Sequence, residues 1–237
     1  MSSSTSSAPS SNPSTNLTTP SSESICTAQH ALYCFDVLLA YFEDREPVDP
    51  PFDNAQEKYA LFVTWNTRSH HRPNKKPTLR GCIGNFSPMR LAQGLREYAL
   101  ISALEDHRFS PIKASELPFL SCNVSLLTPF TPIPDPLSWT PGIHGIHLTF
   151  PSPSSPTSRT LSATYLPEVC LEQGWTKEET VLSAVQKAGY RGKVRVGDEF
   201  WKSLKVKVYG SEKSSTDWDD FVNWKEARGE RFALSLQ

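Results

Sequence analysis

The spacing of apolar residues predicts the first elements of the chain. Between residues 25 and 42 apolar side chains recur every three or four positions, which places them on one stripe of an α-helix. From 59 to 65 apolar residues alternate with other apolar or small residues, as in a strand covered on both faces. The polar run 66–77 is predicted to be a loop, and 78–86 a second strand.

Capping signals place the next helix and separate the strands that follow it. Ser87 and Pro88 are typical of an N-cap and a first helical residue, so a helix of about four turns is predicted to begin there. The segment 151–158, rich in Ser and Pro, is predicted to be a surface loop. Alternating apolar residues predict further strands at 120–126, 144–150 and 161–165.

The C-terminal third supplies two helices and one more strand. Thr176 and Glu179 form the pattern of a capping box, and Gly189 is placed to end the helix that follows. Apolar residues alternating with lysines over 204–208 indicate an edge strand, and a final amphipathic helix is predicted from Thr216. Because helices and strands do not alternate regularly, we predict an α+β fold, with a mainly antiparallel sheet flanked by helices.

Composition narrows the class of protein. The 237 residues are 38% hydrophobic, which is enough for one large core or two small ones. Lys and Arg number 24 against 25 Asp and Glu, a balance that argues against a dedicated nucleic-acid module. No stretch reaches the roughly 20 apolar residues that a membrane span needs. We therefore expect an intracellular protein of the nucleus or the cytoplasm, with no membrane contact.

Cysteine usage and the termini define the expected domain boundaries. The five cysteines are odd in number and lack Cys-x-x-Cys spacing, which argues against a disulfide framework and a structural zinc site. Residues 1–24 are rich in Ser, Thr and Pro and lack the features of a signal peptide, so they are predicted to be a disordered, phosphorylatable tail. Residues 25–228 are predicted to form the folded domain, and 229–237 a C-terminal tail.

The segment 78–84, Thr-Leu-Arg-Gly-Cys-Ile-Gly, carries the strongest candidate chemistry. Strict alternation along a strand would place Arg80, Cys82 and Gly84 on one face, so that the Arg80 charge favours the Cys82 thiolate. Gly81 and Gly84 flank the cysteine, where a ligand or another backbone would approach closely. Two interpretations are open: a reactive or ligand-binding thiol in a crevice, or a small buried cysteine with glycines that let a helix pack on the strand.

Other polar residues are weaker candidates. Asp106 and Arg108 follow the predicted helix and would either line a site with Arg80 or form a structural pair. Glu168, near Tyr165 and one helical turn before Glu172, is a candidate acid or base, or simply a solvated glutamate.

The histidine spacing and the sequence signatures of the chain do not favour metal or nucleotide chemistry. His144 is a second acid–base candidate. His144 and His147 would point to opposite faces of a strand, so no metal site is predicted. No signature of a serine hydrolase, a nucleotide-binding loop or a zinc enzyme occurs.

Several segments in order resemble the AMMECR family, named after the human chromosomal region linked to Alport syndrome, midface hypoplasia and elliptocytosis. The hallmark is Leu-Arg-Gly-Cys-Ile-Gly at 79–84, and the resemblance extends over about 28–226, as in a eukaryotic member. Further matching segments are Ser-Ala-Leu-Glu-Asp-His-Arg-Phe at 102–109, Gly-Ile-His-Gly-Ile at 142–146 and Ala-Thr-Tyr-Leu-Pro-Glu-Val at 163–169. The chain departs from the family at Gly210, where an Arg is expected, and in the insertion after Phe150.

The resemblance implies an α+β fold with a larger domain on an antiparallel sheet, a smaller subdomain and a cleft between them. The family's biochemical activity is not established. Prokaryotic relatives are associated with a Memo-like protein of dioxygenase fold and a radical S-adenosylmethionine protein, which suggests a shared modification pathway.

Two hypotheses of function follow. The first is a small cysteine-centred enzyme or enzyme component of a modification pathway, in which Cys82 is the nucleophile or ligand anchor, Arg80 lowers its pKa, and Glu168 or His144 acts as acid or base. Gly81, Gly84, Asp106, Arg108 and Tyr165 would contribute to binding. The alternative is a non-enzymatic scaffold whose Ser/Pro tail and loop are regulated binding sites. The partner would be a small molecule or a protein, and no cofactor is specified.

Overall fold

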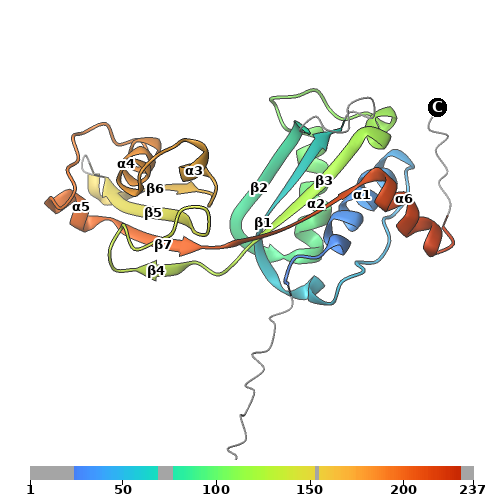
Figure 1. Cartoon of the computed structure of the whole chain (residues 1–237), viewed down its shortest axis with the longest axis horizontal. Coiled ribbons are helices and arrows are strands. Elements are labelled where there is room, and N and C mark those ends of the chain that lie inside the picture. Colours follow the sequence, from blue (N-terminus) through green and yellow to red (C-terminus); the bar gives the residue numbers. More distant parts are fainter. Residues whose placement is uncertain (1–23, 69–76, 153–154, 231–237) are drawn as a thin grey trace, which may run out of the picture.

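The chain forms two lobes, each built on a four-stranded antiparallel sheet (Figure 1). The computed structural model describes residues 24–68, 77–152 and 155–230. In the large lobe the strand order is β2 (Thr78–Arg90), β1 (Lys58–Thr67), β3 (Leu120–Leu127), β8 (Ser211–Asp217). In the small lobe it is β4 (Thr131–Ile133), β7 (Lys205–Tyr209), β5 (Gly145–Ser152), β6 (Ser155–Tyr165). The predicted α+β class is confirmed.

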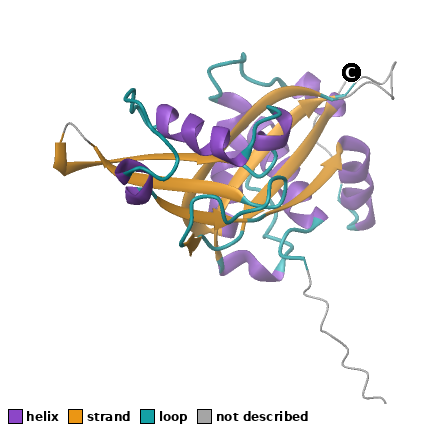
Figure 2. Cartoon of the chain, turned by 60° about the vertical axis from the view of Figure 1, so that its left-hand side comes forward, coloured by secondary structure: helices purple, strands orange, loops and turns teal. Residues whose placement is uncertain are grey.

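Helices pack against the sheets of both lobes (Figure 2). One face of the large sheet is covered by α1 (Ala28–Phe42), α2 (Leu91–Leu104) and α6 (Trp218–Ala227), with the short 3-10 helices η1 (Asp53–Gln56) and η2 (Ala114–Phe119). The small lobe carries α3 (Val169–Glu172), α4 (Lys177–Lys187) and α5 (Glu199–Ser203). No helix in the described ranges is both long enough and apolar enough to span a membrane.

Alternation along the strands directs one set of side chains into the large-lobe core. In β1, Leu61, Val63 and Trp65 are fully buried against the helices. The Trp65 indole donates a 3.0 Å hydrogen bond to the carbonyl of Ala99 in α2 and meets Phe35 of α1 edge-on at 5.0 Å. A buried indole that keeps a hydrogen-bond partner avoids the cost of an unsatisfied donor, so this contact fixes both helices on the sheet.

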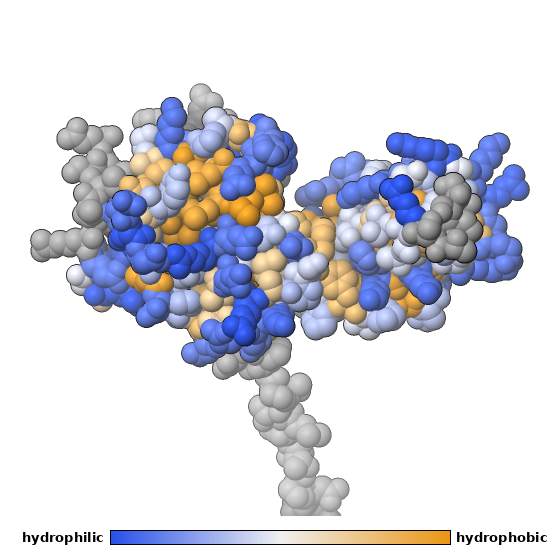
Figure 3. Space-filling model, turned by 180° about the vertical axis from the view of Figure 1, so that it is seen from behind, coloured by the Kyte–Doolittle hydropathy of each residue, from blue (hydrophilic) through white to orange (hydrophobic). Residues whose placement is uncertain are grey.

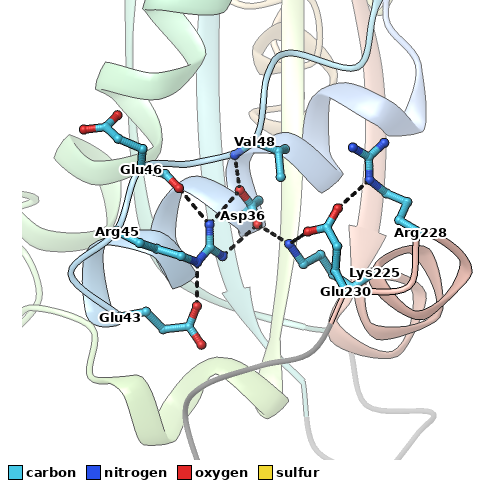
Figure 4. Close-up of polar contacts among 8 residues, drawn as sticks. All are labelled: Asp36, Glu43, Arg45, Glu46, Val48, Lys225, Arg228 and Glu230. Atoms are coloured by element: carbon cyan, nitrogen blue, oxygen red, sulfur yellow. Dashed lines mark hydrogen bonds and ion pairs between the residues drawn. The ribbon is translucent and has the colours of Figure 1, made fainter.

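A buried ionic cluster ties α6 to α1 (Figure 4). Asp36 is fully buried and accepts hydrogen bonds from Arg45, from the Val48 backbone N–H at 2.7 Å and from Lys225 at 2.9 Å. Lys225 also pairs with Glu230. Burial by itself would raise the pKa of Asp36, but the hydrogen bonds from Arg45 and Lys225 outweigh it and lower the pKa.

The small lobe is an insertion between two strands of the large sheet. The chain leaves the large lobe after β3 and returns through β7 and β8, which are separated only by Gly210 (Figure 1). At the junction the Tyr209 ring stacks on Phe130 at 4.5 Å, and its hydroxyl donates to the Tyr165 carbonyl at 3.0 Å. Gly145 faces this ring, and a Cβ there would lie only 2.4 Å from it. Aromatic packing therefore fills the joint between the lobes.

Two predicted boundaries are wrong because a strand continues where another element was expected. Ser87 and Pro88 belong to β2, whose last residues Met89 and Arg90 still pair with β1, so α2 begins only at Leu91. The predicted loop 151–158 largely extends the hairpin of β5 and β6, apart from residues 153 and 154, which lie outside the described residues.

Two predictions near the C-terminus are also corrected. The strand predicted at the edge, β7, is an inner strand, because the short β4 pairs along its other side. The last helix begins at Trp218 with Asp217 as its N-cap, and the polar segment before it is β8. The predicted tail lies outside the described residues over 1–23, as does the predicted loop over 69–76.

Candidate functional site

The face of the large sheet opposite the helices is polar. The strand register arranges its side chains in rows across four strands. Most of these residues are half-buried, but Lys213 and Ser215 of the edge strand β8 are exposed, and Ala60, Ser121 and Leu127 are buried. The first row consists of Cys82, Thr64, Asn123 and Ser215. The next row toward the small lobe consists of Gly84, Phe62, Ser125 and Lys213. We call this surface the open face.

Cys82 is the cysteine whose thiol reaches the open face. The other four, Cys26, Cys34, Cys122 and Cys170, are buried, whereas Cys82 is half-buried. Burial raises the pKa of the Cys26 thiol to about 12 and that of Cys122 well above its usual value. The Thr64 hydroxyl donates a hydrogen bond to the Cys82 sulfur at 3.0 Å. Because the thiolate is the reactive form and needs access, Cys82 is the thiol best placed for chemistry.

The backbone of Cys82 is held at a sheet edge by two side chains. Its N–H donates to Asp106 at 2.9 Å, and its carbonyl accepts from Arg108 at 3.1 Å. Arg108 also binds both carboxylate oxygens of Asp106 and holds the pKa of that carboxyl far below its usual range. The pair therefore occupies the hydrogen-bonding positions that a neighbouring strand would fill along β2. Asp106 and Arg108, both predicted to contribute to binding, therefore lie beside Cys82 as a structural ion pair.

Arg80 does not share the face of Cys82, so the predicted alternation is wrong at this residue. Trp65 pairs with Gly81, but the next residue of β1 pairs with Leu79, which makes Arg80 an extra residue in β2. Such a bulge interrupts the alternation of faces. The Arg80 guanidinium instead forms an ion pair with Glu116 of η2, on the helix side of the sheet, and donates to the carbonyls of Ser110 and Pro111.

The two glycines of the motif serve close packing on opposite faces of β2. A Cβ on Gly81 would lie 2.0 Å from the carbonyl oxygen of Ser102, so α2 rests directly on this residue. A Cβ on Gly84 would lie 2.4 Å from the Phe62 ring, which crosses the glycine on the open face. Gly81 therefore allows a helix to approach, and Gly84 allows the Phe62 ring to lie across β2.

Glu168 connects the small lobe with the open face. It precedes α3, and its carboxylate forms a 2.7 Å ion pair with Lys213 of the second row. Both side chains are partly exposed, 34% and 48% respectively, so the pair is accessible to solvent. Glu168 is thus the predicted acid–base residue that faces the sheet bearing Cys82.

His144 and Tyr165 are placed within the small lobe. His144 lies in the turn before β5, where its Nδ1 accepts from the Thr140 backbone N–H at 3.0 Å. The Tyr165 hydroxyl lies 2.9 Å from Ser183 of α4, and the Lys187 ammonium lies 4.3 Å from its ring. Tyr165 therefore belongs to the helix side of the small sheet. Neither residue contacts the rows of the open face through these bonds.

Sequence reasoning missed the polar neighbours of Cys82. Thr64, Asn123 and Ser215 come from three other strands, and only the register brings them into one row. Their alternation with buried residues was the available signal, since it assigns each to the side away from the core. Across 24–68, 77–152 and 155–230 no group of three or more His, Cys, Asp or Glu residues is arranged to hold a metal ion.

Comparison with known proteins agrees with the fold. The AMMECR1 family model matches residues 31–214. An uncharacterised protein of Arabidopsis thaliana is 41% identical over 197 residues, covering 83% of this chain and 88% of the relative. An uncharacterised protein of Saccharomyces cerevisiae is 40% identical over 199 residues, covering 77% of this chain and 78% of the relative. The crystal structure of an uncharacterised protein of Pyrococcus horikoshii superposes with a TM-score of 0.59 at 27% identity, covering 79% of this chain and 90% of that structure. The chain belongs to the AMMECR1 family.

Proposed function

We propose that the protein is an enzyme or an enzyme component that binds its substrate on the open face, with the Cys82 thiol as nucleophile or anchor. One observation carries the proposal: within the hallmark motif, Cys82 presents its side chain to the open face, while Arg80, Gly81 and Gly84 are engaged in an ion pair or in packing. Residues engaged in packing cannot also react with a substrate, so the thiol is the group of the motif left for chemistry.

The neighbours of Cys82 support substrate binding. The Thr64 hydroxyl donates to the sulfur and orients it, and the Asn123 amide and the Ser215 hydroxyl follow in the same row. Together they offer hydrogen-bond donors and acceptors to a polar substrate group. Glu168, across from this face, is the candidate acid or base. A place in a modification pathway is part of the same proposal.

The scaffold alternative is favoured by a different observation. Asp106 and Arg108 hold the backbone of Cys82, and Gly81 supports α2, so much of the motif region is architectural. A purely structural motif would leave the thiol unreactive in the folded protein. The reactivity of Cys82 therefore separates the two functions.

The test is the alkylation rate of each cysteine in the folded full chain, measured by mass spectrometry between about pH 6 and about pH 9. We expect Cys82 to react at least about tenfold faster than the four buried cysteines, because a thiol must be reached to be alkylated. Thr64→Val removes the hydroxyl that contacts the sulfur, so it should change the Cys82 rate severalfold.

Ser125→Ala is the matched control, since Ser125 lies on the same face but in the next row. This variant should leave the Cys82 rate unchanged. If Cys82 reacts only when the chain unfolds, the thiol has no role on the open face and the scaffold alternative replaces the enzyme.

A further inference from the structure

A second hollow lies where the two lobes meet, apart from Cys82. It is a cavity of about 530 Å³ at the end of the large sheet nearest the small lobe. Ala60 and Leu127 of the open face form part of its wall, and His147 and Lys207 of the small sheet complete it. This volume is typical of a pocket for a metabolite-sized ligand.

Aromatic rings form the apolar part of the cavity. Phe86 and Phe130 both line it, and both contact the Tyr209 ring at the joint, at 6.3 and 4.5 Å between centroids. Phe86 remains 36% exposed, so part of its surface has no protein partner. Ring faces and edges of this kind favour a flat apolar group packed against them.

The polar part of the cavity is cationic. Its charged or titratable side chains besides Tyr59 are Lys58 from β1, His147 from β5 and Lys207 from β7, and no Asp or Glu lines it. Within the part of the chain that the structure describes, neither lysine has an ion-pair partner. Burial and then the Lys207 charge lower the pKa of His147, so its imidazole is uncharged at neutral pH and the two lysines carry the positive charge of the cavity.

His147 adds a directional contact. Its Nδ1 lies 2.8 Å from the Thr164 hydroxyl, which leaves Nε2 as the ring nitrogen without a partner among the described residues. We infer that this cavity binds a small molecule that carries a flat apolar ring and one anionic group, with the ring against Phe86 and Phe130 and the anion at Lys58, Lys207 and His147.

This site goes beyond the proposed function. The Phe62 ring lies between it and Cys82: it crosses Gly84 on one side and meets Phe86 at 5.0 Å on the other. Because residues of both lobes line the cavity, a bound ligand would contact both of them.

Seen from behind, the two lobes are separated by a waist, and apolar residues gather on the large lobe rather than at the outer end of the small one (Figure 3).

The test uses two fluorescent probes with the same rings on the full chain. 8-Anilinonaphthalene-1-sulfonate carries an anion, and N-phenyl-1-naphthylamine does not. In the Lys58→Gln/Lys207→Gln variant, we expect the sulfonate to bind at least about tenfold more weakly and the neutral probe to change by less than about twofold. Phe86→Ala should weaken the binding of both probes, because it removes ring contact without loss of charge.

The matched control is Lys205→Gln, which removes a charge from the same strand outside the cavity. It should leave the affinity of both probes within about twofold of wild type. Circular dichroism and thermal melts establish that each variant is folded. The inference is overturned if the double lysine variant binds the sulfonate as wild type does, or if Phe86→Ala leaves both affinities unchanged.

Discussion

The two faces of the large sheet differ in what covers them and in the side chains that they present. On the covered face Leu61, Val63 and Trp65 are fully buried, and an ionic cluster around Asp36 joins the helices. On the open face the alternate residues of the same strands are mostly polar or glycine, with Ala60, Phe62 and Leu127 as apolar residues at the end nearest the small lobe. The contrast predicts that substitutions on the covered face change stability more than substitutions on the open face, whose residues are not packed under helices.

The hallmark motif crosses this division within a few residues. Gly81 meets α2 on the covered face, and Cys82, the next residue, points to the open face. A motif of this kind can serve architecture and chemistry together, because successive residues of a strand face opposite ways. Variants on either side of β2 therefore test the comparison directly.

The largest effect is expected for Asp36→Asn. The substitution keeps the shape of the side chain but leaves Lys225, whose side chain is only 3% exposed, without its buried carboxylate. Breaking a buried ion pair by removing one partner costs about 3–5 kcal/mol of unfolding free energy. Urea unfolding monitored by circular dichroism measures it.

The Lys225→Met variant is the control, because Asp36 keeps its hydrogen bonds from Arg45 and from the Val48 backbone N–H in that variant. It should lose less stability than Asp36→Asn. A loss by Asp36→Asn below about 1 kcal/mol would show that the cluster does not hold the covered face together.

A smaller loss is expected for Gly81→Ala. The added Cβ would sit 2.0 Å from the Ser102 carbonyl, so α2 must shift away from the sheet, at a cost of about 1–3 kcal/mol. Gly210→Ala is the comparison, since its Cβ would meet Thr128 at 3.2 Å, a far milder approach. The same unfolding experiment ranks the two, and equal stability of both variants would contradict a role of Gly81 in helix packing.

The smallest effects are expected on the open face. Asn123→Ala and Ser215→Ala should each change the unfolding free energy by less than about 0.5 kcal/mol, because these side chains are not part of the core. Thermal melts compare these two variants with Val124→Ala, which truncates a fully buried side chain of the same strand pair. A loss for Asn123→Ala as large as that for Val124→Ala would mean that the open face is structural as well.

The elements with strong apolar periodicity could be predicted from the sequence. The stripe in 25–42 is α1, and the Thr176 capping box is formed at the start of α4. The strand β8 could not be predicted, because its residues, Ser-Glu-Lys-Ser-Ser-Thr-Asp, are all polar. It forms because β3 offers a free edge along which its backbone can pair.

The candidate site was only partly predictable for a similar reason. Cys82 stands out in the motif, but its contact with Thr64 depends on the register between β1 and β2. The bulge that turns Arg80 toward Glu116 cannot be recognised from the alternation of residues in the sequence. Cross-strand pairs are set by tertiary structure, so the sequence indicates which residue to examine and not what surrounds it.

The insertion of the small lobe has a consequence for synthesis on the ribosome. The small-lobe strands form one continuous stretch of the nascent chain, whereas the large lobe requires β8 and α6, which emerge after it. Asp36 and Lys225 are 189 positions apart, so their ion pair cannot form until the whole small lobe has been translated. We expect the early α1–β3 segment to be the part of the nascent chain that depends most on chaperones.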